Sequence, residues 1–186
     1  MIVTAAKVLE LREKHGLIEG LSKRERRNPE GVGLEVRLGT AYELSSDGFL
    51  GTETRDTPDS KEVLEEGEWL EIGSGDYYLV ETVEEVEVPA EPVELAGTEA
   101  HLMPDVYPRS TLQRSGIYFK GTNTNPGYSG PLIFGVKNVS DQDFRLEQGS
   151  RIAEIVFKQA YGGLERAYEG QWQGGRVSTD SEEEQI

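Results

Sequence analysis

Short runs of alternating apolar and polar residues recur along this chain, and they limit it to a β-rich fold. In "GVGLEVRLG", residues 31–39, apolar side chains occupy every second position, as a half-buried strand requires. Similar runs follow, among them "DYYLVETV", "GIYF", "GPLIFGVKN" and "SRIAEIVF", and Gly, Pro, Asn or Asp separates them about every eight to twelve residues. This spacing favours an all-β barrel or sandwich over alternating strands and helices.

One segment departs from the strand pattern. Thr4 can cap a helix in which Val8, Leu9 and Leu11 face inward, and Gly16 is placed to end it. A chain of 186 residues is long enough for one domain with a real core. We therefore predict a single β-barrel domain with one short N-terminal helix over residues 4–15. Residues 45–60, rich in Gly, Asp, Ser and Thr, are expected to form a long surface loop.

The charge balance limits what the chain can bind. There are 19 Lys and Arg against 35 Asp and Glu, so the formal net charge is −16 at pH 7. Duplex nucleic acid and anionic membranes are bound through cations that neutralise phosphates, so neither is an expected partner. An anionic ligand would need a local basic site.

Residue usage excludes further classes. The chain has no Cys and two His, which excludes a disulfide framework and argues against a histidine-rich metal centre. No stretch approaches the roughly 20 apolar residues of a membrane span, and the N-terminus has no apolar run of signal-peptide length. We expect a soluble, cytoplasmic protein.

The last part of the chain is polar and glycine-rich, with Tyr161, Tyr168 and Trp172 spaced along it. Such a segment cannot build a core of its own, so it is either disordered or folds over something else. We expect a barrel domain over residues 1–158, a C-terminal lid segment over residues 159–175 and an acidic, disordered tail over residues 176–186.

The segment "YPRSTLQRSG", residues 107–116, is the first candidate site. A helix N-terminus offers free N–H groups and a partial positive charge, so Arg109, Ser110 and Thr111 would form a phosphate seat. Arg114 would add a second cation. The alternative is that Ser110 merely caps a short helix and the two arginines pair with the abundant glutamates.

The segment "NTNPGYSGPLIFGVKN", residues 123–138, is the second candidate. Asn125 and the Pro-Gly pair after it predict a turn, and Tyr128 follows directly. An aromatic ring beside an amide can stack on a base or sugar while the amide binds a hydroxyl. Residue types alone leave open that Tyr128 packs in the core and Asn125 only forms the turn. In a third segment, "EQGSRIAEIVF", Arg151 and Glu154 are either a ligand pair or an ordinary surface pair.

Taken in this order, the three segments resemble the trimeric dUTPase and dCTP deaminase family, with the dCTP deaminase branch nearer. "PRSTLQRSG" looks like the family's phosphate motif, "NPGYSG" with "LIFGVKN" like its pyrimidine and sugar motif, and "GSRIAEIVF" like its late barrel motif. "GVGLEVRLG", "GDYYLVETVEEVEVP" and "AYEGQWQGG" resemble further segments of the deaminase branch. The resemblance covers most of residues 1–175.

The resemblance implies a fold and a ligand. The fold would be a distorted, dUTPase-like jelly-roll β-barrel that assembles as a homotrimer, with active sites between subunits and a tail that closes over the bound nucleotide. The ligand would be a deoxyribonucleoside triphosphate, with a pyrimidine favoured, bound as its Mg²⁺ complex. The metal would be held mainly by phosphate oxygens, with no ligand from the protein.

The resemblance also implies residue roles. By position, Arg109, Ser110 and Arg114 would contact phosphates, as Thr111 would if the helical turn is a phosphate seat. Gln171 in the tail would lie over the phosphates. The sugar would be bound by two other residues, Asn125 at its 3′-hydroxyl and Tyr128 at its face. Arg114 and Asn125 are then the candidate catalytic residues.

Three residues depart from the family pattern. Asn125 stands where the dUTPase branch has an Asp that helps to position water, and an amide cannot take up a proton at neutral pH. Gly135 stands where the deaminase branch has a proton-shuttling Glu, and Glu154 where Gln is common. The interval between Gly116 and Asn125 is also shorter than the resemblance predicts, so we expect a shortened hairpin at the base edge.

These features leave three functional hypotheses. The favoured one is a pyrimidine deoxynucleoside triphosphate hydrolase that is dCTP deaminase-like, converting dCTP to dUTP or dUMP, or dUTPase-like. The second is a nucleotide-binding sensor or regulator without catalysis, because the usual carboxylates at positions 125 and 135 are missing. The third is a structural trimer whose acidic surface and 45–60 loop bind another protein.

Overall fold

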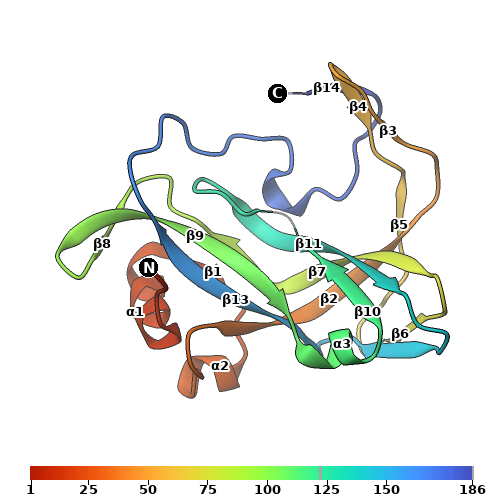
Figure 1. The fold of residues 1–186 in the computed structure, drawn as a ribbon, viewed down its shortest axis with the longest axis horizontal. Helices are drawn as coiled ribbons and strands as arrows, with labels where there is room; N and C mark the ends of the chain where they lie inside the picture. The colour runs from red at the N-terminus through yellow and green to blue at the C-terminus, as the bar shows by residue number, and fades with distance from the viewer. Residues whose placement is uncertain (122, 186) are drawn as a thin grey trace.

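The computed structural model of the protein describes residues 1–121 and 123–185, and most of its regular structure is β-strand (Figure 1). In chain order the elements are α1 (Ala5–His15), β1 (Ile18–Glu19), α2 (Lys23–Arg27), β2 (Leu34–Leu44), β3 (Phe49–Leu50), β4 (Thr54–Asp56), β5 (Ser60–Glu62), β6 (Trp69–Ile72), β7 (Tyr77–Glu87), β8 (Val93–Leu95), β9 (Thr98–Pro108), α3 (Ser110–Arg114), β10 (Ile117–Lys120), β11 (Ser129–Asn138), β12 (Phe144–Glu147), β13 (Arg151–Ala160), the 3-10 turn η1 (Gln173–Gly175) and β14 (Glu183–Glu184).

The largest sheet follows the order β10-β11-β7-β2-β13-β9-β8, with β1 added on β7 and β5 on β2. Neighbouring strands run antiparallel. The register shifts between Leu38 and Thr40 in the β2–β7 ladder and between Pro131 and Ile133 in the β11–β7 ladder. Irregularities of this kind bend strands and increase their twist. The curled, all-β fold class predicted from the alternating runs is confirmed.

The core lies inside this curled sheet. The alternation in β2 buries Leu34, Val36 and Leu38 completely, each at 0% exposure, and Phe157 of β13 is equally buried. Val32, which precedes the strand, is 40% exposed. The predicted strand at 31–39 therefore begins later, at Leu34, and continues further, to Leu44.

The N-terminal helix is confirmed. The Thr4 side chain accepts a hydrogen bond from the first turn of α1, and Gly16 ends the helix at φ 75°, in the left-handed region that glycine tolerates best. Val8 and Leu11 are buried, and Leu9 packs against the same core. No described helix combines the length and apolar character needed to cross a membrane.

A second helix, α2, is absent from the sequence prediction. Its sequence, "KRERR", has no apolar periodicity, which is why pattern reasoning missed it. The overlooked signal is the "SKRE" stretch. The Ser22 side chain accepts a hydrogen bond from the Glu25 N–H, 3.2 Å away, as in the first half of a capping box.

The C-terminal tail differs from the prediction of disorder. Residues 176–185 lie against the β3–β4 hairpin, where β14 pairs with β4 (Figure 1); residue 186 lies outside the described residues. Thr179 is buried, and its hydroxyl accepts a hydrogen bond from the Thr57 N–H at 2.9 Å. Polar pairing, which composition does not reveal, orders this segment. The division of the chain into barrel, lid and tail stays a prediction.

Candidate functional site

The predicted helical turn of the phosphate motif is present as α3. The Arg109 N–H donates to the Ile152 carbonyl at 2.9 Å, and the buried Leu112 anchors the turn to the core. Arg109, and not Ser110, occupies the N-cap position, and no side chain caps this helix. The alternative in which Ser110 caps the turn is therefore wrong. Ser110 is instead the first residue of the helix, and its side chain is exposed.

The other members of the predicted phosphate seat are also accessible. Ser110, Thr111 and Arg114 all lie on the exposed side of α3. Among the described residues Arg114 has no ion-pair partner within 4.0 Å. These three side chains are free to meet a molecule that approaches from outside the chain.

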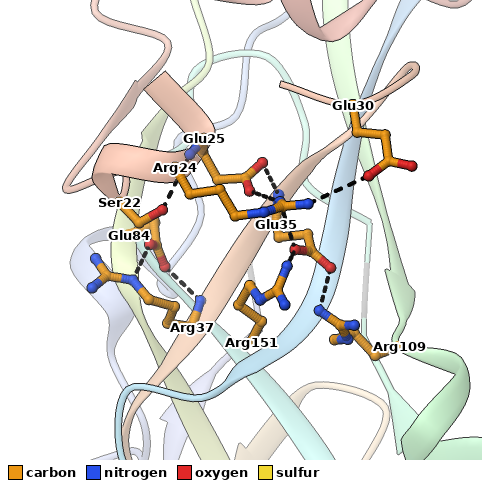
Figure 2. Close-up of polar contacts among 9 residues, drawn as sticks. All are labelled: Ser22, Arg24, Glu25, Glu30, Glu35, Arg37, Glu84, Arg109 and Arg151. Carbon is orange, nitrogen blue, oxygen red and sulfur yellow. Dashed lines mark hydrogen bonds and ion pairs between the residues drawn. The ribbon is translucent and has the colours of Figure 1, made fainter. Parts of the chain in front are cut away.

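Arg109 is held by a carboxylate. Figure 2 shows Glu35 of β2 at the centre of a cluster in which Arg109 and Arg151 both donate to its side chain. Arg24 of α2 reaches the same carboxylate at 3.1 Å. The Glu35 side chain is 20% exposed, so it lies at the edge of the core. The prediction that the α3 arginines pair with glutamates is confirmed for Arg109.

The overlooked helix α2 completes this cluster. Glu25, which is 1% exposed, accepts a hydrogen bond from the Glu35 N–H at 3.1 Å and pairs with Arg24 (Figure 2). The neighbouring carboxylates raise the pKa of Arg24, with the hydrogen bond to Glu25 as the largest cause. The network fixes the Arg109 guanidinium group relative to β2 and β13.

Arg151 and Glu154 do not pair with each other in the way the third motif allowed. Arg151 donates to Glu35. Glu154 lies opposite Glu35 in the β13–β2 ladder and packs on Gly33, where a Cβ would sit 2.2 Å from the Glu154 Cγ. Gly33 therefore leaves space for the Glu154 side chain at this site.

A cavity with a volume of about 490 Å³ lies where β7, β10 and β11 meet the C-terminal segment. Aromatic side chains form much of its wall: Tyr77, Tyr118, Tyr128, Phe134, Tyr168 and Trp172. Lys120 and Arg176 add two cations. None of the described residues that line it is an Asp, a Glu or a His. The cavity suits a ligand that combines a flat ring with an anionic group.

The turn at Asn125 places the predicted sugar-binding pair in this cavity. Both Asn125 and Tyr128 line it, and the Tyr128 N–H closes the turn on the Asn125 carbonyl at 3.1 Å. The Tyr128 hydroxyl donates to the Pro131 carbonyl, and burial raises the pKa of Tyr128 to about 12. Tyr128 is thus both a core residue and a cavity wall, so the two readings of this residue are compatible.

Gly135 lies in the floor of the same cavity, opposite Leu79 in the β11–β7 ladder. A Cβ at position 135 would lie 2.5 Å from the Tyr77 hydroxyl oxygen. The Tyr77 ring therefore occupies the space through which a side chain at position 135 would extend.

Residues 168–177 close one side of the cavity. Trp172 lines it, and the Arg55 guanidinium lies over the indole ring at 4.7 Å from the ring centroid. Gln171 accepts a hydrogen bond from Arg55 and donates to the Glu184 carbonyl at 2.9 Å. Gln171 therefore holds the C-terminal segment together, and it is not among the described residues that line the cavity.

The structure brings only part of the predicted site together. Asn125 and Tyr128 line the cavity. The α3 residues, Arg109, Ser110, Thr111 and Arg114, are not among its described lining residues. Sequence reasoning missed four lining residues, which reach the cavity from three segments: Tyr77 from β7, Tyr118 and Lys120 from β10, and Arg176 from the C-terminal segment. The alternation in "GIYFK" places the tyrosine and the lysine on one face, and this is the only local signal.

Fold and site together define an all-β protein with an aromatic cavity suited to a flat, anionic ligand. Residues 2–160 match a family model described as dCTP deaminase-like. The chain belongs to the dCTP deaminase-like family. The dUTPase-like fold and the family resemblance inferred from the motifs are therefore confirmed.

Individual relatives agree with this assignment. The chain is 32% identical over 143 residues to a probable deoxyuridine 5'-triphosphate nucleotidohydrolase of Aeropyrum pernix, which covers 77% of this chain and 83% of the relative. It is 27% identical over 179 residues to a dUMP-forming dCTP deaminase of Aquifex aeolicus, which covers 94% and 90%. The 2'-deoxycytidine 5'-triphosphate deaminase structure from Agrobacterium tumefaciens shares the fold, with a TM-score of 0.63 at 16% identity over 88% of this chain. The match spans 49% of that longer chain.

Proposed function

We propose that the protein binds a pyrimidine deoxyribonucleoside triphosphate in the aromatic cavity. The observation that carries this proposal is the cavity lining: aromatic walls, the Asn125 amide and two cations, in a chain whose formal net charge is −16. Lys120 and Arg176 would attract the anion locally against the charge of the whole chain. Tyr128 would face the sugar and Asn125 its 3′-hydroxyl.

The phosphate chain would be bound by α3 of a neighbouring subunit in a homotrimer. Arg109 and the three α3 residues Ser110, Thr111 and Arg114 are outside the described lining of their own cavity, and the three α3 residues are exposed. A site between subunits would place the α3 turn of one chain beside the cavity of another. Mg²⁺ would be held by the phosphate oxygens, which lowers the charge that the acidic protein has to accommodate. Gln171 would reach the phosphates only if the C-terminal segment rearranged.

Binding without turnover is the favoured form of this function. Water activation needs a group that can take up a proton, and the described lining residues contain no Asp, Glu or His. Loss of a general base lowers a rate by about 10² to 10⁴. Asn125 and Gly135 thus favour a nucleotide sensor or regulator over the hydrolase that the motifs alone favour.

A hydrolase of dCTP deaminase or dUTPase type is the second candidate. Two observations favour it: relatives with these names align with most of the chain, and residues 168–177 enclose the cavity as a lid would. A neighbouring subunit would then have to supply the missing carboxylate, and Arg114 and Asn125 would position the water.

A thermal-shift series tests the binding proposal. With Mg²⁺ present, dUTP or dCTP at a hundredfold excess over Kd should stabilise the fold by about 2.7 kcal/mol, and Arg109→Ala should reduce this shift. Arg145→Ala is the matched control, because Arg145 is an exposed surface arginine on β12. A shift that is the same in wild type and Arg109→Ala would show that α3 is not the phosphate seat. If no nucleotide shifts the melting temperature, the result would favour the structural-trimer hypothesis over nucleotide binding.

Product analysis separates the two candidates. Wild-type protein is incubated with dCTP or dUTP and Mg²⁺, and dUTP, dUMP and pyrophosphate are resolved by chromatography. We expect ligand to be recovered unchanged. Turnover above background by folded protein would contradict the sensor function and support the hydrolase function.

A further inference from the structure

Tyr77 and Gly135 form a contact that controls one wall of the cavity. Tyr77 of β7 pairs with Lys137 of β11, and its ring crosses diagonally to Gly135. A Cβ at position 135 would be 2.5 Å from the hydroxyl oxygen and 3.1 Å from the Cζ atom of Tyr77. A real Cβ does not approach another atom to 2.5 Å, so the absence of a side chain at 135 and the position of this ring depend on each other.

The Tyr77 hydroxyl is available for a ligand. Both Tyr77 and Gly135 line the cavity, and the Tyr77 residue is 42% exposed. No hydrogen bond joins this hydroxyl to another side chain or carbonyl within residues 1–121 and 123–185. By contrast, the Tyr128 hydroxyl is already bound to the Pro131 carbonyl. Tyr77 therefore presents an unused donor and acceptor to the cavity.

We propose that Tyr77 is the base-recognition residue of this cavity and that its hydroxyl hydrogen-bonds the polar edge of the pyrimidine ring. This inference rests on the proposed nucleotide-binding function. It adds the residue that would distinguish a ligand with a base from a ligand without one. The ring also forms a flat wall above Gly135.

The chemistry of the phenol fits recognition better than proton transfer. A neutral hydroxyl can donate to a ring carbonyl or accept from a ring amine. Desolvation raises the pKa of Tyr77 above its ordinary value, so the group stays protonated at neutral pH. It can therefore hold the base without removing a proton from water or from the ring.

The test compares two ligands and three proteins. The ligands are dUTP and the abasic analogue 2-deoxyribose 5-triphosphate, each with Mg²⁺. The proteins are wild type, Tyr77→Phe and the matched control Tyr78→Phe. Tyr78 is the next residue on β7, points to the opposite face of the sheet and is not among the cavity-lining residues. Both substitutions remove one hydroxyl and keep the ring.

Tyr77→Phe should weaken dUTP binding by about threefold to tenfold, the range of one net hydrogen bond, and leave binding of the abasic analogue unchanged. Tyr78→Phe should change neither. Equal weakening of both ligands by Tyr77→Phe, or no weakening of dUTP, overturns the role of Tyr77 while nucleotide binding itself stands. If wild type binds neither ligand, the proposed function fails and this inference fails with it.

Discussion

Asn125 presents the cavity with an amide, which donates and accepts hydrogen bonds but does not take up a proton near neutral pH. The sequence singles out Asn125 and Tyr128 because a Pro-Gly turn places them within one short segment, and both line the cavity. Their role in sugar binding stays a prediction. It could not predict Tyr77. Two tyrosines stand side by side in "DYYL", and alternation alone does not say which of them faces a cavity.

Glu35 is the single residue whose loss should affect the α3 region most. Three guanidinium groups, from Arg24, Arg109 and Arg151, meet its carboxylate at the edge of the core. Glu35→Gln would leave these cations close together with less compensating charge. We expect the free energy of unfolding to fall by about 1–3 kcal/mol, measured by urea denaturation.

The matched control for this change is Glu30→Gln. Glu30 also pairs with Arg24, at 3.3 Å, but its side chain is 86% exposed. Exposed ion pairs contribute little, so this change should stay within about 0.5 kcal/mol of wild type. Equal effects of the two substitutions would mean that the Glu35 cluster is only an ordinary surface network.

Among the elements, α1 was predictable and the C-terminal segment was not. The helix carries its own boundaries, since Thr4 caps one end and Gly16 ends the other. The segment 176–185 has few apolar residues and reads as disordered, yet it docks on the β3–β4 hairpin. Glu183 pairs with both Arg55 and Arg176 at 2.8 Å. Arg176 lies seven residues before Glu183 in the sequence, but Arg55 lies 128 residues before it, so no local pattern reveals the docking.

The Glu183 contacts should make this docking sensitive to pH. Hydrogen bonds from Arg55, with a smaller contribution from Arg176, lower the pKa of Glu183 below the ordinary 4.5. A lowered pKa in the folded state means that the ionised carboxylate stabilises the docked segment above the ordinary pKa. This stabilisation is lost as the pH falls through the lowered value.

Fluorescence of Trp172, which packs under Arg55, reports the release. In a Trp69→Phe background, we expect an acid transition in the wild-type segment and a changed signal already at neutral pH in Glu183→Gln. Glu184→Gln is the control, because the Glu184 side chain makes no ion pair with any described residue. Identical behaviour of the two variants would rule out Glu183 as the group that holds the segment.

At the scale of the whole molecule, the alternating runs predicted the β class and the ordered motifs predicted the family. The cavity was not predictable, because its walls come from β7, β10, β11 and the C-terminal segment. Within one chain, no described residue of the α3 turn lines this cavity. The proposed nucleotide site therefore requires a second copy of the chain, which would bring a phosphate seat to the sugar and base.

Subunit mixing tests this dependence most directly. Arg109→Ala chains have an intact cavity, and Asn125→Ala chains have an intact α3. Each variant alone should bind dUTP poorly. Co-expressed with different tags and purified as mixed trimers, they should regain about a third of the wild-type sites, since one of the three interfaces of a mixed trimer joins an intact cavity to an intact α3 turn. Calorimetric titration with dUTP and Mg²⁺ gives the number of sites. A mixture that binds no better than its parents would contradict the account.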